Sequence, residues 1–248
     1  HSATRMWIAH GSKRCTNSTT LVLEAPMGPD RFFETRGRDR SAQIMKLPGS
    51  VRALLAQIGR LAETQGVSAY AVGGCVRDWC LGKRDVVDVD MTVEGDGVVL
   101  AQAVAQAFTG TLRTHPQFGT ATVSLAPGRK RHTPDTGPIR RMDVATCRQE
   151  TYAKPAAYPK VTRGTLKDDL FRRDFTINAL AIRVNRNKFG QLIDPFNGLE
   201  DLRRGDIRIL HDQSFADDPT RILRAVRFEQ RFGFRIEEKT FKLLKGAL

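Results

Sequence analysis

The chain has 248 residues, contains little cysteine and has no long hydrophobic run. Its four cysteines, Cys15, Cys75, Cys80 and Cys147, form no CxxC pair and show no zinc-ligand spacing, so we expect free thiols in a reducing compartment, the cytoplasm. No apolar stretch approaches the roughly 20 residues that a membrane-spanning helix needs, so no membrane segment is expected. The apolar core of a secretion signal is missing as well.

Acidic residues are also scarce relative to basic ones. The chain has 27 Asp and Glu against 40 Lys and Arg, which gives a net charge of +13. So large an excess indicates a polyanionic partner. Nucleic acid is favoured over acidic membrane lipid, and a basic solvated surface is the plain alternative.

The sequence divides into three parts. Residues 1–45 lack sustained periodicity, and we expect a disordered or non-native extension, or sequence upstream of a start at Met45. Residues 46–194 are expected to form a mixed α/β head, and 195–248 the beginning of a helical neck that is cut within a larger protein. Periodicity and turn residues predict these elements: helices at 51–65, 76–81, 98–108, 166–182, 219–232 and 237–248, and strands at 69–72, 86–93, 121–125 and 141–147.

The most informative motif is Asp88-Val89-Asp90, within an apolar run expected to be a strand. Residues two apart on a strand point to one face, so the two carboxylates lie together. Such a pair rarely stabilises a fold, but it suits Mg²⁺, which proteins hold through one or two carboxylates and substrate phosphates. A solvent-facing acidic strand end is the alternative. Asp143, on a neighbouring predicted strand, is a candidate third carboxylate, or a surface residue at a strand edge.

A glycine turn precedes this motif. Gly73 and Gly74 follow the strand at 69–72 and would let the backbone approach a phosphate, and Arg77 would add a charged donor. The pattern predicts a site for a nucleoside triphosphate and a metal ion. A strand-to-helix turn with a surface arginine is the alternative, and Asp78 is expected to tether Arg77.

Two further polar groups follow along the chain. In the predicted helix at 166–182, Asp174 and Asn178 are four residues apart and would share one face, beside Arg172 and Arg173. The second group is the most distinctive polar array of the sequence: Asp217, Asp218, Arg221, Arg224 and Arg227. Internal salt bridges and a charged helix face are the respective alternatives.

The motifs GGCVRD…DVD, DLFRRDFTINALAI, DPFNGLEDL and DDPTRILRAVRF occur in this order between Tyr70 and Leu248. Together they resemble the class II tRNA nucleotidyltransferases and the related bacterial poly(A) polymerases. The segments VEGDG, RQETY and AYPK look most like the CCA-adding and A-adding branches. The resemblance implies an α/β nucleotidyltransferase head like that of polymerase beta, with a mixed sheet, followed by an all-helical neck.

The resemblance also implies roles for these residues. Asp88 and Asp90 would ligate Mg²⁺ in two-metal catalysis, and the group from Arg172 to Asn178 would read the ribose. Asp218 and Arg221 match positions that hydrogen-bond the base edge of the incoming nucleotide, whereas Asp217 stands where many relatives carry Glu. The expected function is template-independent addition of A, or CCA, to tRNA 3′ ends from ATP and CTP with release of pyrophosphate. A poly(A) polymerase and a nucleotide- or RNA-binding fragment with little activity are the alternatives.

Overall fold

The computed structural model describes residues 33–35, 43–125 and 136–248. The predicted N-terminal extension lies mostly outside the described residues. Within it, β1 (Phe33–Thr35) and β2 (Gln43–Met45) pair antiparallel, and the Met45 side chain is buried in the core. The division at residue 45 stays a prediction. None of the helices in the described part of the chain is both long and apolar enough to cross a membrane.

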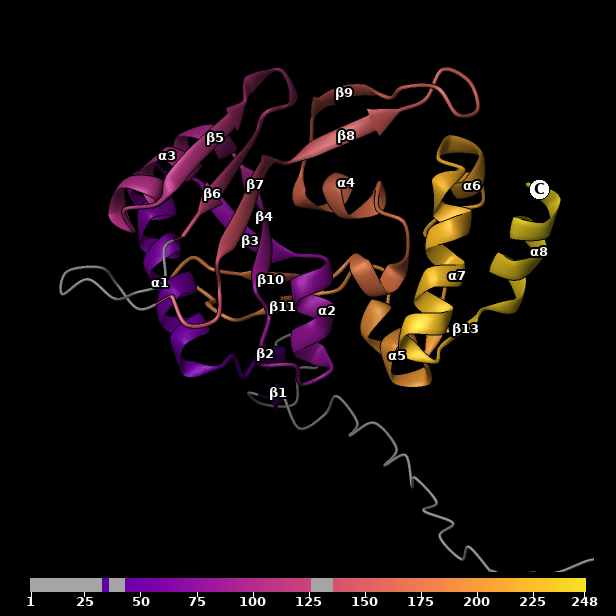
Figure 1. Ribbon diagram of the computed structural model, residues 1–248, viewed down its shortest axis with the longest axis horizontal. Helices are drawn as coiled ribbons and strands as arrows, with labels where there is room; N and C mark the ends of the chain where they lie inside the picture. The colour runs from indigo at the N-terminus through magenta and orange to yellow at the C-terminus, as the bar shows by residue number, and fades with distance from the viewer. Residues whose placement is uncertain (1–32, 36–42, 126–135) are drawn as a thin grey trace, which may run out of the picture.

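A seven-stranded mixed sheet organises the head (Figure 1). Its order is β11-β10-β3-β4-β7-β6-β5, and β4 and β7 are the neighbours that run parallel. The strands are β3 (Ser68–Val72), β4 (Asp88–Glu94), β5 (Thr111–His115), β6 (Thr120–Ser124), β7 (Arg141–Thr146), β10 (Ala181–Arg183) and β11 (Leu192–Ile193). The predicted strands at 69–72, 86–93, 121–125 and 141–147 are therefore confirmed, and β4 lies at the centre of the sheet.

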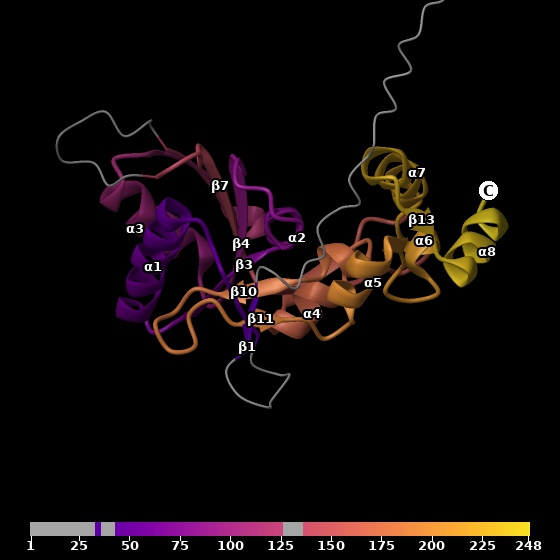
Figure 2. The same ribbon diagram turned by 90° about the horizontal axis from the view of Figure 1, so that it is seen from below.

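Helices cover the sheet on both sides. In Figure 2, α1 (Gly49–Thr64) and α3 (Gly97–Ala107) lie on one side of the central strands, and α4 (Leu166–Phe171), whose Leu166 and Leu170 pack against β3, lies on the other. Val89, Met91 and Val93 of β4 are buried, whereas the alternate residues Asp88 and Asp90 are exposed. This alternation of a central strand directs both carboxylates away from the core.

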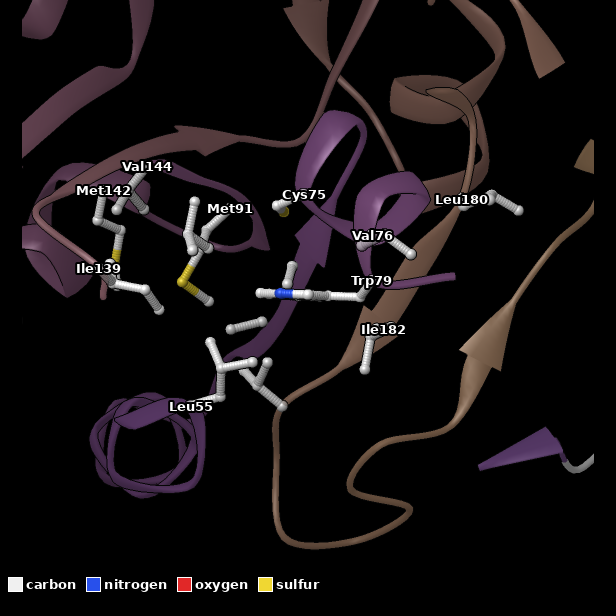
Figure 3. Close-up of a cluster of buried hydrophobic side chains, with 14 of the residues drawn as sticks. Leu55, Cys75, Val76, Trp79, Met91, Ile139, Met142, Val144, Leu180 and Ile182 are labelled. Carbon is white, nitrogen blue, oxygen red and sulfur yellow. The ribbon is translucent and has the colours of Figure 1, made fainter. Parts of the chain in front are cut away.

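A short helix, α2 (Gly74–Cys80), follows β3 and packs into the hydrophobic core between the sheet and α1. Figure 3 shows its Trp79 side chain close to Leu55 of α1 and Met91 of β4. Cys75 and Cys147 are buried free thiols, as their apolar surroundings predict, and burial raises the pKa of each to about 12. These thiols pack as small apolar side chains.

The prediction of one helix over 166–182 is wrong. The segment forms α4 (Leu166–Phe171), a 3₁₀ turn η3 (Thr176–Asn178) and the strand β10. Thr165 and Asp168 form a capping box that begins α4. The helical bonding pattern breaks at Arg173, whose backbone N–H donates to the Leu170 carbonyl oxygen three residues back, and the Phe175 N–H then donates to the Asp174 carboxylate at 2.8 Å. Before α4, β8 (Arg148–Thr151) and β9 (Lys160–Arg163) form a hairpin that the sequence did not predict.

The C-terminal part is mainly helical, as predicted. It contains α5 (Gly198–Arg204), α6 (Ser214–Asp217), α7 (Thr220–Phe232) and α8 (Glu238–Gly246), with β12 (Asp206–Ile207) and β13 (Arg235–Ile236) pairing parallel. Asp194 accepts hydrogen bonds from the backbone of Gly198 and Leu199 and so caps α5. Phe228 of α7 is buried against Phe175, with ring centroids 5.7 Å apart, and this contact joins α7 to the head.

Candidate active site

Three carboxylates lie at the junction of β4 and β7. Asp88 and Asp90 share the exposed face of β4, and the parallel register places Asp143 directly beside Asp90. The spacing of Asp88 and Asp90 in the sequence therefore predicted their shared face correctly, and the register places the candidate third carboxylate beside them. Their chemical roles stay predictions.

The three carboxylates differ in their partners. Asp143 accepts a hydrogen bond from the Thr122 hydroxyl at 2.5 Å and pairs with Arg141 at 3.0 Å. The side chains of Asp88 and Asp90 have no hydrogen bond or ion pair with the described residues. Loss of solvation raises the pKa of Asp90 above its ordinary value, with Arg173 opposing the shift and Asp143 and Asp88 adding to it.

This donor set fits a hard divalent cation. Two unpaired carboxylates on one face, with room beside them, are the ligands that such an ion takes together with substrate phosphates. The described residues contain no group of three His, Cys, Asp or Glu side chains converging on one point. Asp88 and Asp90 would therefore hold the ion, while Asp143 is turned toward Thr122 and Arg141.

The glycine turn lies against the carboxylates. Gly73 has φ +75° and ψ −132°, a conformation essentially restricted to glycine, and a Cβ at this position would lie 2.6 Å from Nη1 of Arg173. Arg77, one turn into α2, is 4% exposed. Its Nε donates to Asp78 at 3.0 Å and its Nη1 to Asn178 Oδ1 at 2.5 Å, so Asp78 tethers Arg77 as predicted.

Arg172 and Arg173 project from the end of α4. Both are held by Asp169, which is completely buried and accepts hydrogen bonds from Arg172 at 2.8 Å and Arg173 at 3.0 Å. Although burial opposes it, the charges of Arg173 and Arg172 lower the pKa of Asp169. Arg172 also pairs with Glu150 at 3.3 Å. Asp169 thus fixes both arginines beside the carboxylates.

Asp174 and Asn178 do meet, although no continuous helix joins them. The Asn178 amide donates to Asp174 Oδ1 at 2.9 Å, and the guanidinium of Arg224 donates to Asp174 Oδ2 at 2.8 and 2.5 Å. Asp174 is 7% exposed. The shared helical face predicted for the pair was wrong, but their proximity was right, because the turn at η3 brings the two side chains together.

The predicted polar array lies at the start of α7. Arg221 is buried and donates to Ser214 Oγ and to the Arg172 carbonyl oxygen, both at 2.7 Å. Asp218 accepts from the Thr220 hydroxyl at 2.6 Å, and its Oδ2 lies 3.8 Å from Arg221 Nε. Asp217 ends α6, 3.9 Å from His211. Arg227 has no partner among the described residues.

One cavity of about 960 Å³ connects these groups. It is an open cavity lined by the glycine turn, the end of α4, η3, the β8–β9 hairpin, α6 and α7. Most of the site residues predicted from the sequence line this cavity: Gly73, Gly74, Arg77, Asp90, Arg172, Arg173, Asp174, Asn178, Asp217, Asp218, Arg221, Arg224 and Arg227. Asp143 and Asp88 lie outside it and line two smaller cavities of about 360 and 370 Å³, respectively, and Asp90 borders all three.

The sequence reasoning missed part of the lining. Arg148, Glu150 and Tyr152 of the RQETY segment face the cavity, and the Tyr152 hydroxyl donates to Glu150 at 2.9 Å. Loss of solvation and the bond to Glu150 raise the pKa of Tyr152 to about 12. Arg148, Glu150 and Tyr152 are two residues apart, so a strand prediction would have placed them on one face. The β8–β9 hairpin was not predicted, and this signal was therefore missed. Asp169 was also missed, although it lies within the DLFRRDF motif.

A mixed sheet that presents paired carboxylates beside a glycine turn and an arginine-lined cavity defines a nucleotidyltransferase head. The chain belongs to the family described as the poly A polymerase head domain, whose sequence pattern matches residues 69–208.

Individual relatives agree with this assignment. An A-adding tRNA nucleotidyltransferase of Geobacter sulfurreducens is 44% identical over 202 residues, covering 82% of this chain and 22% of the relative. One of Aquifex aeolicus is 48% identical over 180 residues, covering 73% and 20%. A solved tRNA nucleotidyltransferase complexed with a primer tRNA and an incoming ATP analogue is 43% identical, with a TM-score of 0.65, covering 77% of this chain and 49% of that chain. The chain thus spans about a fifth of the length of the two curated relatives.

Proposed function

We propose that this chain carries the catalytic head of a template-independent tRNA nucleotidyltransferase. It would transfer AMP from ATP, or CMP and AMP in turn from CTP and ATP, to the 3′-hydroxyl of tRNA and release pyrophosphate. The observation that carries the proposal is the 960 Å³ cavity, which brings the predicted glycine turn, arginines and base-reading residues together beside Asp90. The net charge of +13 suits a polyanionic RNA substrate.

Asp88 and Asp90 are proposed to hold Mg²⁺. When bound, such an ion activates the attacking hydroxyl and stabilises negative charge on the transferred phosphate and on pyrophosphate. The described residues make no ion pair or hydrogen bond with these two side chains, which supports this role because both carboxylates are available as ligands. Asp143, beside Asp90, is proposed to orient the primer 3′-hydroxyl by accepting a hydrogen bond from it.

The remaining residues bind and orient the nucleotide. The backbone at Gly73 and Gly74 is proposed to approach the triphosphate, with Arg77 and Arg173 as charged donors. Asp174 and Asn178 are proposed to read the ribose from η3. Pairing between buried polar groups and a base edge can reject a wrong base strongly, because a mismatch leaves them unpaired.

Base reading is proposed for the cavity wall formed by α6 and α7. Asp218 and Arg221 are the proposed readers, since both line the cavity and lie 3.8 Å apart. Asp217, Arg224 and Arg227 line the same wall. Arg227 has no partner among the described residues, which leaves its guanidinium available for a phosphate or base.

A-addition is favoured over full CCA addition because the two curated relatives described above are A-adding enzymes. A poly(A) polymerase is the second candidate, supported by the family match over residues 69–208. A nucleotide- or RNA-binding fragment with little turnover is the third. The buried free thiols of Cys75, Cys80 and Cys147 suit a reducing compartment, and we propose the cytoplasm.

The test is extension of three tRNA transcripts that end before CCA, after C and after CC, with labelled ATP or CTP and Mg²⁺. A single A added only to the CC end is the expected result. Stepwise CCA addition would assign the full activity, and a long A tail would assign a poly(A) polymerase. No incorporation by a folded chain that binds ATP would leave only the binding function.

A further inference from the structure

Arg77 is enclosed by two aromatic rings that come from α7, more than 150 positions away in the sequence. Its guanidinium carbon lies 4.7 Å from the centroid of Phe232 and 5.3 Å from that of Phe228. The two rings stack on each other with centroids 5.7 Å apart. Arg77 is therefore fixed by ring faces as well as by the hydrogen bonds to Asp78 and Asn178 described above.

Together with further hydrogen bonds, these contacts form a closed cycle of interactions between the head and α7. Arg77 donates to Asn178, Asn178 donates to Asp174, and Asp174 accepts from Arg224 of α7. The Arg224 guanidinium lies 5.5 Å from the Phe228 ring, which returns to Arg77. A displacement of α7 would therefore alter the orientation of Arg77 through two separate routes.

The surroundings of Phe232 distinguish it from an ordinary core residue. Besides Arg77, its ring has the Lys83 ammonium at 5.3 Å and the Arg231 guanidinium at 5.1 Å. Cations near an aromatic face are attracted by the ring quadrupole. Three cations around one half-buried ring indicate that the ring organises positive charge at the cavity wall, in addition to burying apolar surface.

We propose that Phe232 is a positioning residue that, together with Phe228, orients Arg77 toward the triphosphate and so couples the position of α7 to phosphate binding. The inference rests on the proposed function, in which Arg77 contacts the triphosphate. Phe232 itself contacts no substrate in this scheme. It acts through Arg77.

The first experiment compares Phe232→Leu, which keeps apolar bulk but removes the ring, with Phe232→Tyr, which keeps the ring. The dissociation constants of ATP and of adenosine are measured by calorimetry on the full chain, with thermal unfolding as the folding check. Phe232→Leu is expected to weaken ATP binding roughly 3- to 30-fold, the range of a cation–π contact, and to leave adenosine binding unchanged. Phe232→Tyr should bind ATP like the parent chain.

The matched control is Leu223→Ala, on the same helix. Leu223 is 74% exposed and lines none of the cavities described above, so neither ligand's affinity should change. An equal loss of ATP and adenosine affinity in Phe232→Leu would overturn the proposal, because it would show a general disturbance of α7. Unchanged ATP affinity in Phe232→Leu would overturn it as well.

A double-mutant cycle with Arg77→Gln separates the inference from the function on which it rests. If Phe232 acts through Arg77, Phe232→Leu adds no further loss of ATP affinity in the Arg77→Gln background. Fully additive losses would refute the coupling. If Arg77→Gln alone leaves ATP affinity unchanged, the proposed role of Arg77 fails, and that result is distinct from a failure of Phe232 alone. In tRNA extension, Phe232→Leu should raise the KM for ATP more than it lowers kcat.

Discussion

The β4 side of the site and the side formed by α4 and η3 differ in how their charges are satisfied. On the β4 side, Asp88 and Asp90 are exposed carboxylates without partners among the described residues. On the opposite side, Asp169 and Asp174 are buried, and each accepts several hydrogen bonds from arginines or an amide. The carboxylates of the β4 side are thus available to a ligand, whereas those of the other side are paired within the protein.

This difference shows how a site can be rigid and reactive at once. A buried ion pair that is fully hydrogen-bonded holds its members in one geometry, and removing one partner leaves an uncompensated charge. An unpaired carboxylate repels its neighbours until a cation binds. We infer that the cross-bonded side positions the nucleotide while the open side supplies the metal ligands. The following predictions test that division.

The largest effect is expected on the open side. Asp88→Asn or Asp90→Asn should lower nucleotide incorporation at least 1000-fold, about 4 kcal/mol, since each removes a proposed metal ligand. Thermal unfolding should show no loss of stability, because neither side chain has a hydrogen bond or ion pair with the part of the chain that the structure describes. A variant with full activity, or one that is strongly destabilised, would contradict the division.

The next effect is expected on the cross-bonded side. Asp169→Ala should lower the free energy of unfolding by about 3 kcal/mol, because Arg172 and Arg173 are then left without their buried partner. The half-buried neighbour Asp168 is the control: Asp168→Ala removes one half of the α4 capping box and should cost about 1 kcal/mol. Equal losses in urea unfolding would mean that the buried pairing of Asp169 with the two arginines stabilises the fold no more than a helix cap does.

Acid sharpens the same comparison. The pKa of Asp169 is lowered from 3.8 by Arg173 and Arg172, so its ionised form stabilises the fold above about pH 4. That stabilisation is lost as the pH falls through the lowered pKa. The difference in stability between the parent chain and Asp169→Ala should therefore be constant near neutral pH and shrink in acid.

The sequence predicted the open side better than the cross-bonded side. Side chains alternate between the two faces of any β-strand, whether the sheet is flat or twisted. The shared face of Asp88 and Asp90 therefore followed from local geometry. Asp143 was only a candidate in the sequence, because its position beside Asp90 depends on the parallel pairing of β4 with β7. Helices α1, α3, α7 and α8 were predicted from their apolar periodicity, and their ends differ from the predictions by a few residues.

The cross-bonded side depends on tertiary contacts that no local pattern contains. The segment 172–180 has helical spacing, but pairing of β10 with β3 and the hydrogen bond from the Phe175 N–H to Asp174 override it. Asp169 and Glu150 are separated by 19 positions and meet at Arg172 only in the folded chain. Their positioning roles were therefore not visible in the sequence.

The glycine turn gives a smaller effect with an internal control. Gly73→Ala should cost about 2 kcal/mol, because its φ of +75° strains a residue with a Cβ and the added atom lies 2.6 Å from Arg173. Gly74→Ala should be neutral or slightly stabilising, since Gly74 is helical and its Cβ would meet Arg77 at an ordinary 3.6 Å. Equal stability of the two variants in thermal unfolding would argue against a constrained turn.

The smallest effect concerns Asp143, which shares features of both sides: it stands beside Asp90 but is held by Thr122. Thr122→Val keeps the shape of the side chain and removes the hydroxyl that donates to Asp143. Loss of one such bond is worth about 1 kcal/mol, so incorporation should fall roughly 5-fold if the third carboxylate must be oriented. Thr111→Val, at an exposed position of β5, is the control and should have the parent rate. If Thr122→Val also has the parent rate, Asp143 needs no orientation by Thr122, and its pairing with Arg141 is sufficient to hold it.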